Sequence, residues 1–315
     1  TGRARRQAWP GAGGRQSWRY LTSNLTRKLP PHSPRCPGFL QCATVNKAPE
    51  HMNTLRLATW NVNSLRVRLP QLWDWLDLTE PEGGIQLMGL QETKTEDAAF
   101  PWEDFESCDW HVAHHGQKTY NGVALVSREP LSDVVRNLPG LEDEQARVIT
   151  ATTLGLRVIC AYFPNGQAPD SDKFQYKLRW LEALKAHVRD QLAQHPRLVL
   201  MGDFNITRDE NDVYDPVELA GTIHCTDIER QAFSDLLDLG FHDALRLFHS
   251  EPQQFSWWDY RAAAFRRNRG LRIDHVLVSE ALKPEASDCV IDKRPRTFER
   301  PSDHTPVVLS LVKAP

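Results

Sequence analysis

The chain has 315 residues, of which 40% are hydrophobic and 25% are charged, and its formal net charge is −3 at pH 7. These values are typical of a soluble globular protein with one large α/β domain or two small ones. No segment approaches about 18 consecutive apolar residues, so we expect no membrane-spanning helix and no membrane partner. The six cysteines form no C-x-x-C pair and no tight cluster, which indicates free cytosolic thiols rather than a zinc ribbon or a disulfide framework.

The first 52 residues are strongly basic. They contain nine Lys or Arg and one acid, Glu50, a balance of +8, so residues 53–315 carry −11 to reach the total of −3. The segment is rich in Arg, Pro, Gly and Ser and has no helical or alternating pattern, so we expect it to be a disordered extension.

Three further interpretations of residues 1–52 stay open. The segment could be an organellar transit peptide, although four prolines between Pro30 and Pro37 disfavour the amphipathic helix that such a peptide needs. It could be a basic arm that binds nucleic acid. It could also be sequence that is not part of the native protein, since the first methionine is Met52. We expect the disordered or non-native interpretation, and a cytoplasmic protein of the bacterial type.

From Leu55 onward the sequence predicts strands and helices. Runs that are β-branched or continuously apolar and bounded by turn residues predict strands. Apolar positions three or four residues apart predict a helix over 172–195, with Asp172 as its cap. A second helix over 227–240 ends at Gly240, and Trp73 and Trp75 of an early helix belong to the core. The predicted strands are 55–62, 85–92, 122–128, 147–163, 197–205, 271–279 and 305–312. We therefore predict one α/β (α+β) domain over 53–315, with sheets packed between helical layers.

Polar side chains recur at the ends of these apolar runs. Taken singly, each is more often a turn former, a cap or a satisfied structural residue. If the strands lie side by side, however, their ends converge, and unpaired charges there need a metal or a substrate as partner. The residues are Asn61, Asn63, Glu92, Lys94, Tyr162, Asn165, Asp203, Asn205, Asp274, Asp303 and His304.

The residue types at these strand ends indicate a hard metal ion. The candidate ligands Glu92, Asp203 and Asp303 are oxygen donors, as are the nearby amides, which favours Mg²⁺ or Mn²⁺ over zinc. A hard cation beside a histidine and an aspartate suits the attack of water on a phosphate ester. The residues alone predict a metal-dependent phosphoesterase and do not choose its substrate.

Seven short motifs, in their order and spacing, resemble one known family. The motifs are WNVNSLR, QETK, YFPNG, GDFN, FSWWDY, NRGLRIDH and PSDH, and they extend over about residues 54–313. They resemble the exonuclease III family of apurinic/apyrimidinic endonucleases, within the endonuclease/exonuclease/phosphatase superfamily. GDFN and SDH recur across that superfamily, whereas the FSWWDYR and FRRNRGLRIDH segments resemble the bacterial exonuclease III branch. The resemblance implies a four-layered α/β sandwich, two mixed β-sheets flanked by helices, with the site where both sheets present their ends.

The resemblance also implies roles for the metal-binding and proton-transferring residues. Glu92 would bind Mg²⁺, for which Mn²⁺ can substitute, with Asn61 close to the ion and Asp303 a further ligand. Asp203 would handle a proton, by activating water or by assisting the leaving group. Lys94 is either structural or faces the phosphate. The residues expected to hold or surround the metal are Asn61, Glu92, Asp203, Asn205, Asp303 and His304.

A second group would contact the scissile phosphate. By the same resemblance, His304 contacts the phosphate and is oriented by Asp274, while Asn205 stabilises the transition state. Tyr162 matches the active-site tyrosine of the family, and Asn165 contacts the phosphate nearby.

DNA contacts are expected from a tryptophan and a basic loop. Trp257 matches the position that packs against the base-free sugar, where stacking contributes about 1–3 kcal/mol per base, whereas Trp258 is expected to be buried. Arg266, Arg267 and Arg269 either form a solvated loop or contact the phosphate backbone, and we expect backbone contact. In the segment 211–221, Tyr214 either obstructs the abasic-sugar pocket or points into the core.

We therefore expect a monomeric Mg²⁺-dependent hydrolase that cuts duplex DNA 5′ to abasic sites and removes 3′ nucleotides and 3′ blocking groups. One alternative is a 3′ exonuclease that lacks abasic endonuclease activity. Another is a phosphatase of the superfamily that acts on a small-molecule or lipid phosphate ester and does not need Trp257 or the basic loop. A non-catalytic DNA-binding or scaffold protein would have lost Glu92, Asp203, Asp274 and His304, and all four are present.

Overall fold

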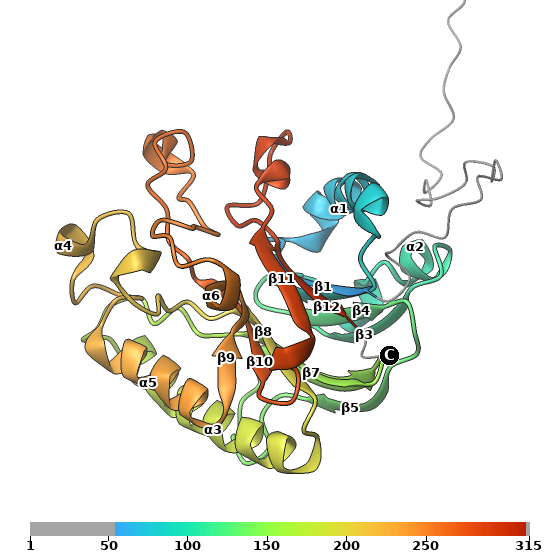
Figure 1. The fold of residues 1–315 in the computed structure, drawn as a ribbon, viewed down its shortest axis with the longest axis horizontal. Helices are drawn as coiled ribbons and strands as arrows, with labels where there is room; N and C mark the ends of the chain where they lie inside the picture. The colour runs from blue at the N-terminus through green and yellow to red at the C-terminus, as the bar shows by residue number, and fades with distance from the viewer. Residues whose placement is uncertain (1–53, 313–315) are drawn as a thin grey trace, which may run out of the picture. The chain divides into compact units, whose positions relative to one another are not determined.

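Two mixed sheets of six strands each form the centre of the part that the computed structural model describes, residues 54–312 (Figure 1). The basic segment 1–52, with its predicted disorder, lies outside the described residues. The first sheet has the order β11 (Ala286–Ile291), β12 (Val307–Val312), β1 (Thr54–Asn61), β2 (Leu87–Gln91), β4 (Val123–Ser127) and β3 (His111–His115). The second has the order β5 (Ser132–Arg136), β6 (Val148–Thr153), β7 (Leu156–Tyr162), β8 (Leu198–Asp203), β10 (Asp274–Ser279) and β9 (Phe241–Asp243).

Each sheet contains one parallel pair of strands connected by a helix, and its other neighbouring strands are antiparallel. In the first sheet β1 and β2 are parallel and α1 (Leu65–Thr79) connects them. In the second sheet β7 and β8 are parallel and α3 (Asp172–Gln194) connects them. The last residues of β1 and β2, and likewise of β7 and β8, therefore come to the same edge of their sheet.

Three buried clusters show that the layers are helix, sheet, sheet and helix. Inward-facing residues of both sheets, such as Leu125 and Val199, share one core. On the outer face of the first sheet, α1 and α2 (Trp102–Glu106) contribute Trp75 and Phe105. On the outer face of the second sheet, α3 and α5 (Asp227–Asp238) contribute residues such as Phe233. The predicted four-layered α/β sandwich is confirmed.

Short helices complete residues 54–312. These are α4 (Pro216–Leu219), α6 (Ala244–Phe248) and the 3₁₀ turns η2 (Glu80–Glu82), η3 (Asp97–Ala99), η4 (Glu210–Asp212), η5 (Arg261–Ala263), η6 (Lys283–Glu285) and η7 (Arg294–Thr297). Within this range, none of the helices combines the length and the apolar character needed to cross a lipid bilayer.

The structure corrects two expectations. The run 147–163 is a hairpin of β6 and β7 rather than one strand, because Leu154 and Gly155 both have positive φ and form a tight turn. The cap of α3 is Ser171, whose hydroxyl accepts a hydrogen bond from the Phe174 amide, and Asp172 is the first helical residue.

The glycine of the GDFN motif is required by the close approach of two strands. A Cβ on Gly202 would lie 1.8 Å from the Ala161 carbonyl oxygen of β7. The next residue, Asp203, ends β8 and is paired in register with Tyr162 of β7 and Asp274 of β10. Phe204 is fully buried and stacks on Phe163 at 4.2 Å between ring centroids, so it anchors the end of β8 in the core.

Candidate active site

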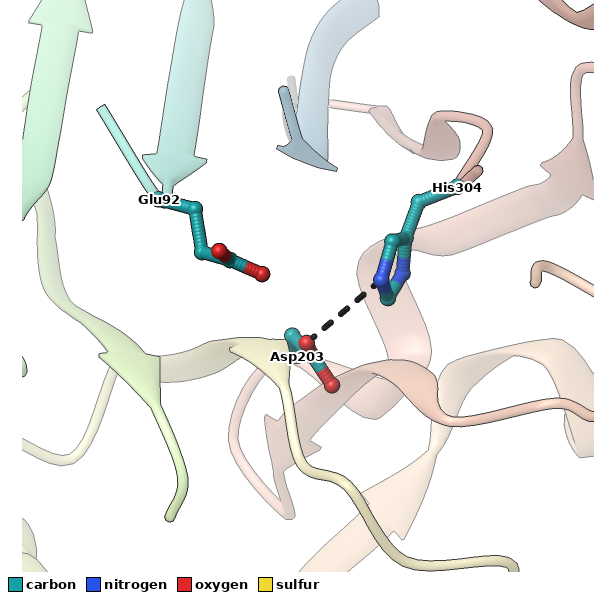
Figure 2. A group of neighbouring side chains, drawn as sticks. All are labelled: Glu92, Asp203 and His304. Atoms are coloured by element: carbon teal, nitrogen blue, oxygen red, sulfur yellow. Dashed lines mark ion pairs between the residues drawn. The ribbon is translucent and has the colours of Figure 1, made fainter. Parts of the chain in front are cut away.

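The ends of the two sheets are joined by one amide. Asn61, the last residue of β1, donates through Nδ2 to Glu92 Oε1 at 2.8 Å and to Asp203 Oδ2 at 2.9 Å. Figure 2 shows Glu92, Asp203 and His304 pointing toward a common space, from the residue after β2, the end of β8 and the loop before β12. One ligand atom of each of the three lies within 4.8 Å of the others. The sequence-predicted residues Asn61, Glu92, Asp203 and His304 are therefore brought together.

Several backbone positions at this site are strained. Asn63, Glu92, Lys94 and Asn205 have φ between 44° and 52°, the left-handed region that non-glycine residues seldom adopt. Such conformations cost on the order of 1 kcal/mol each and persist where the surrounding structure fixes them, often at functional sites. All four residues closely follow the ends of β1, β2 or β8, so these conformations occur where the strands end at the site.

Lys94 pairs with the proposed metal ligand. Its Nζ lies 2.8 Å from Glu92 Oε2 and also donates to Asn63 Oδ1. Each oxygen of Glu92 thus faces a donor, the amide of Asn61 on one side and this ammonium on the other. The Glu92 side chain keeps 17% exposure, so the carboxylate remains accessible from the surface.

His304 is held by a buried carboxylate. Its Nδ1 lies 2.9 and 3.1 Å from the two oxygens of Asp274, and Ser256 Oγ donates to the same carboxylate at 2.6 Å. Burial lowers the pKa of His304, but the negative charges of Asp274 and Asp203 outweigh it and raise that pKa to about 10. The imidazole is therefore an imidazolium at neutral pH, with Nε2 3.7 Å from Asp203 Oδ2.

Asp203 is a buried carboxyl group whose pKa is raised to about 7. Burial raises its pKa, His304 and the Asn61 amide lower it, and Asp274 and Glu92 raise it, with a net value of about 7. The backbone amide of Asn205 donates to its Oδ1 at 2.9 Å. A group with a pKa near 7 can take up and release a proton at physiological pH.

Amides and a phenol line the other side of the site. Asn165 donates to Asn205 Oδ1 at 3.2 Å, and Asn205 Nδ2 donates to the Phe163 carbonyl at 3.1 Å. Burial and the charges of Glu92 and Asp203 raise the pKa of Tyr162 well above its usual range, so its phenol stays protonated. The structure therefore brings Tyr162 and Asn205 beside the carboxylates and Asn165 against Asn205.

Asp303 is not one of the three clustered ligand groups. Its Oδ1 accepts from Asn63 Nδ2 at 2.9 Å and its Oδ2 accepts from the indole Nε1 of Trp257 at 3.0 Å. Trp257 in turn forms an isolated backbone bridge with His304 and remains partly exposed. Asp303 therefore fixes Trp257 against the site in this structure. Trp258 is fully buried, as expected.

The basic loop divides into free and engaged arginines. Arg266 and Arg267 are exposed in the turn after η5. Arg269 donates to the Tyr214 hydroxyl at 3.0 Å and to Glu218 at 2.8 Å, with its guanidinium 4.5 Å from the centre of the Tyr214 ring. Tyr214 is partly buried and packs against the small clusters that contain Val213 and Trp258, while its hydroxyl donates to Glu218. His224 is the bulky side chain that contacts Asn165 and Asn205.

Three residues of the site were not predicted from the sequence. Ser256 bonds Asp274, His224 Nδ1 lies 2.6 Å from the Asn205 carbonyl, and Lys177 donates to that carbonyl at 2.8 Å. Lys177 had a signal, since it lies three residues after Phe174 and four before Leu181, on the apolar face of α3. Ser256 lies within the FSWWDY motif, but no local pattern indicates its bond to Asp274 or the contacts of His224, because these partners are 18 and 19 positions away.

A cavity of about 500 Å³ adjoins Tyr162 and Asn165. Arg147 crosses its wall, with its guanidinium 4.9 Å from the Tyr162 ring and 6.0 Å from the Tyr176 ring. The lining is mostly polar and aromatic: Gln117, Tyr120, Asn121, Gln145, Arg147, Tyr162, Pro164, Asn165, Gly166, Gln167, Lys173 and Tyr176. The open space beside the strand ends is therefore wide enough for a group larger than one phosphate.

The donor atoms fit a hard divalent cation. The carboxylates of Glu92 and Asp203 are held side by side by the amide of Asn61. Their negative charge is partly balanced by Lys94 and His304, which lie beside them. Two of the three clustered groups, Glu92 and Asp203, offer carboxylate oxygens, which Mg²⁺ and Mn²⁺ prefer. A four-layered sandwich with this cluster at its strand ends defines the class of metal-dependent phosphoesterases.

Comparison with known proteins identifies the family. Residues 58–304 match the endonuclease/exonuclease/phosphatase family, and the chain belongs to it. It is 35% identical over 266 residues to exodeoxyribonuclease III of Haemophilus influenzae, covering 80% of this chain and 98% of that protein.

Solved structures agree in fold. A variant of the 3′ phosphatase NExo from Neisseria, bound to product DNA hairpin, is 46% identical, with a TM-score of 0.79 over 82% of this chain and all of that one. An AP endonuclease from Archaeoglobus fulgidus is 36% identical, with a TM-score of 0.77 and the same coverage.

Proposed function

We propose that this protein is a Mg²⁺-dependent DNA repair phosphodiesterase of the exonuclease III type. It cuts duplex DNA 5′ to abasic sites and removes 3′ nucleotides and 3′ blocking groups. The observation that carries the proposal is the amide of Asn61, which joins Glu92 and Asp203 across the two sheets beside the paired His304 and Asp274. The similarity to proteins described as exodeoxyribonuclease III, 3′ phosphatase and AP endonuclease supports DNA as the substrate.

Glu92 is assigned as the main ligand of the metal. It is the most accessible carboxylate of the cluster, and Asn61 and Lys94 fix both of its oxygens. When bound, Mg²⁺ neutralises charge on the phosphate and on the leaving oxygen. Asp303, with both oxygens engaged by Asn63 and Trp257, orders the surroundings of this site.

Asp203 is assigned as the proton acceptor. Its pKa of about 7 lets it take a proton from the attacking water while the water oxygen forms a bond to phosphorus. The bond between phosphorus and the leaving oxygen breaks in the same displacement. The proton held by Asp203 can then return to the leaving oxygen or to solvent, so the carboxylate is regenerated.

The groups around Asp203 are assigned to the phosphate. The imidazolium of His304 and the amide groups of Asn205 and Asn165 are donors that can bind non-bridging oxygens as negative charge develops. Tyr162 keeps its proton and supplies a further donor. Asp274 touches His304 and not the phosphate, so it acts by orienting and charging the imidazole.

Contacts to DNA are assigned to the partly exposed Trp257, to Arg266 and Arg267, and to the cavity beside Asn165. Trp257 offers a ring face against which a base-free sugar or an unstacked base can pack. The two exposed arginines offer charge to the backbone in a chain that is otherwise acidic. The cavity of about 500 Å³ offers room for the nucleotide next to the reacting phosphate.

A second candidate function is 3′-end processing without incision at abasic sites. The 46% identity to a protein described as a 3′ phosphatase favours it. So does His224, a bulky side chain that lies 3.4 Å from the side-chain nitrogen of Asn165 and 2.6 Å from the Asn205 carbonyl, beside the amides assigned to the phosphate.

The test uses two labelled duplexes with Mg²⁺ or with EDTA. One has a central tetrahydrofuran abasic analogue, and the other has a nick with a 3′ phosphate. The main proposal expects Mg²⁺-dependent products from both, and the second candidate expects product from the nicked duplex only. The Asp203→Asn variant controls for contaminating nuclease. If neither duplex reacts, the assignment to DNA repair is wrong.

A further inference from the structure

Lys177 is a lysine of α3 whose side chain is completely buried. Its ammonium group forms an ion pair with Glu229 and donates to two backbone carbonyls, that of Asn205 at 2.8 Å and that of Asn165 at 3.3 Å. A lysine ammonium has three N–H donors. All three are therefore used within the protein, and none is left for solvent or for a substrate.

The two carbonyls belong to Asn165 and Asn205, the residues whose side-chain amides are assigned above to the phosphate. Asn165 lies in the loop after β7, and Asn205 lies in the loop after β8. Asn205 has a φ of 49°, and its carbonyl accepts from Lys177 and contacts His224 Nδ1 at 2.6 Å. While both carbonyls accept from the lysine, the two side chains bond each other, with Asn165 Nδ2 donating to Asn205 Oδ1 at 3.2 Å.

The loops are packed against the lysine as well as bonded to it. A Cβ on Gly166 would lie 3.1 Å from Lys177 Cδ, so the loop after β7 rests directly on the aliphatic stem. The counterion Glu229 also accepts hydrogen bonds from the Thr226 and His224 amides at the start of α5. One buried charge therefore links the loop after β7, the loop after β8 and the segment that carries His224.

We propose that Lys177 is a positioning residue for phosphate ester hydrolysis, holding Asn165 and Asn205 in the geometry that receives the phosphate. The proposal rests on the function proposed above. The competing explanation is that the Lys177–Glu229 ion pair only stabilises the fold. Buried ion pairs contribute little to stability, since replacing both partners with apolar residues often leaves a protein equally stable. The two explanations differ in what happens when both charges are removed together.

The experiment compares Lys177→Met with the double variant Lys177→Met/Glu229→Gln in the full chain. The matched control is Lys185→Met, two turns further along α3, where the lysine pairs with Asp235 of α5 outside the site. For each protein, the melting temperature, kcat and KM on the nicked 3′-phosphate duplex, and the half-saturating Mg²⁺ concentration are measured.

A positioning role predicts that the double variant recovers the melting temperature lost in Lys177→Met, because no unpaired charge remains buried. Its kcat stays on the order of 100-fold below wild type, since misplaced groups cost about that much. The half-saturating Mg²⁺ concentration stays within about 2-fold of the wild-type value, because Lys177 does not touch Glu92, and Lys185→Met keeps the wild-type kcat.

Recovery of kcat together with stability in the double variant would assign Lys177 a structural role and overturn the proposal. A rise in the Mg²⁺ requirement parallel to the loss of kcat would also overturn it, because the effect would then act through the metal. Wild-type protein that leaves both duplexes intact refutes the proposed function instead, so the two failures are distinguishable. If Lys177→Met does not fold, the double variant alone decides.

Discussion

Asp274 and His304 form a buried carboxylate–imidazole pair in which both carboxylate oxygens lie within 3.1 Å of Nδ1. Because Asp274 is also the register partner of Asp203 across β10 and β8, the same pairing brings Nε2 to 3.7 Å from Asp203. The imidazole of His304 therefore lies between the carboxylates of Asp274 and Asp203. The central imidazole is positively charged because it has a carboxylate on each side.

Replacing Asp274 with Asn should lower the pKa of His304 from about 10, because the first of the two charges that raise it is lost. If the imidazolium binds the phosphate, activity that persists in the wild type up to pH near 10 will be lost at lower pH in Asp274→Asn. The pH dependence of kcat on the nicked duplex measures this. Asp292→Asn is the control, since Asp292 pairs with Arg294 and Trp75 instead. Identical pH profiles for Asp274→Asn and wild type would show that Asp274 does not set the charge of His304.

The same pair makes stability depend on pH. Folding raises the pKa of His304 above its unfolded value near 6.5, so its stabilisation is complete below about pH 6.5 and is lost as pH rises through about 10. Asp203 acts in the same direction at lower pH, because its raised pKa means that folding favours its protonated form, an advantage lost between 3.8 and about 7. The free energy of unfolding in EDTA should therefore fall between pH 6.5 and 9.5.

Urea unfolding of wild type and His304→Gln at both pH values tests this dependence. Each unit of pKa difference corresponds to about 1.4 kcal/mol, so the wild type should lose a few kcal/mol more than the variant over this interval. Equal losses in the two proteins would mean that the charge on His304 does not depend on folding.

The central strands could be predicted from the sequence, whereas the strands at the sheet edges could not. The predicted runs correspond to β1, β2, β4, β6, β7, β8, β10 and β12, although the pattern of 147–163 predicts one strand where the structure has β6 and β7. The four missed strands, β3, β5, β9 and β11, are the two edges of each sheet. Edge strands have one unpaired side and carry polar residues that limit aggregation, so sequences such as SDVVR and ASDCVI lack the continuous apolar run of a central strand.

For the site, residue types at strand ends were informative and tertiary partners were not. Asp203 and Asn205 flank an apolar Phe204, and alternation along a strand predicts that Phe204 points inward, as it does. The inward direction of the Asn205 carbonyl, however, depends on Lys177, and Lys177 depends on Glu229, 52 positions later in the chain. Such a network is fixed only when α3 and α5 pack together, so no local pattern encodes it.

Glu92→Gln should raise the Mg²⁺ concentration needed for activity more than it lowers kcat at saturating metal. Glutamine keeps an oxygen donor but loses the charge that a hard cation prefers. Activity on the nicked duplex is followed over a Mg²⁺ titration. Glu103→Gln, on the exposed side of α2, should leave the titration unchanged. A wild-type Mg²⁺ requirement in Glu92→Gln would remove Glu92 from the metal site.

Asp203→Asn and His304→Ala should each lower kcat by about 10²–10⁴-fold, the usual contribution of a proton acceptor or a charged donor at the reacting group. Both residues are assigned to the reacting phosphate and neither contacts the rest of the DNA, so the affinity for DNA should change little. Fluorescence anisotropy in EDTA with the nicked duplex measures binding separately from turnover. Near-normal kcat in either variant would contradict the role given to that residue.

Arg266→Ala/Arg267→Ala should weaken DNA binding and reduce its dependence on salt, with kcat at saturating DNA nearly unchanged. Each phosphate contact releases condensed counterions, so losing two contacts lowers the slope of log affinity against log salt by about 2 on duplex DNA. Arg189→Ala is the control, because it removes one positive charge from an exposed position on α3, outside the basic loop. Binding curves at several salt concentrations separate the possibilities. An unchanged slope would mean that the two arginines form a solvated loop, and DNA would then have to be bound by Trp257 and the cavity beside Asn165 without them.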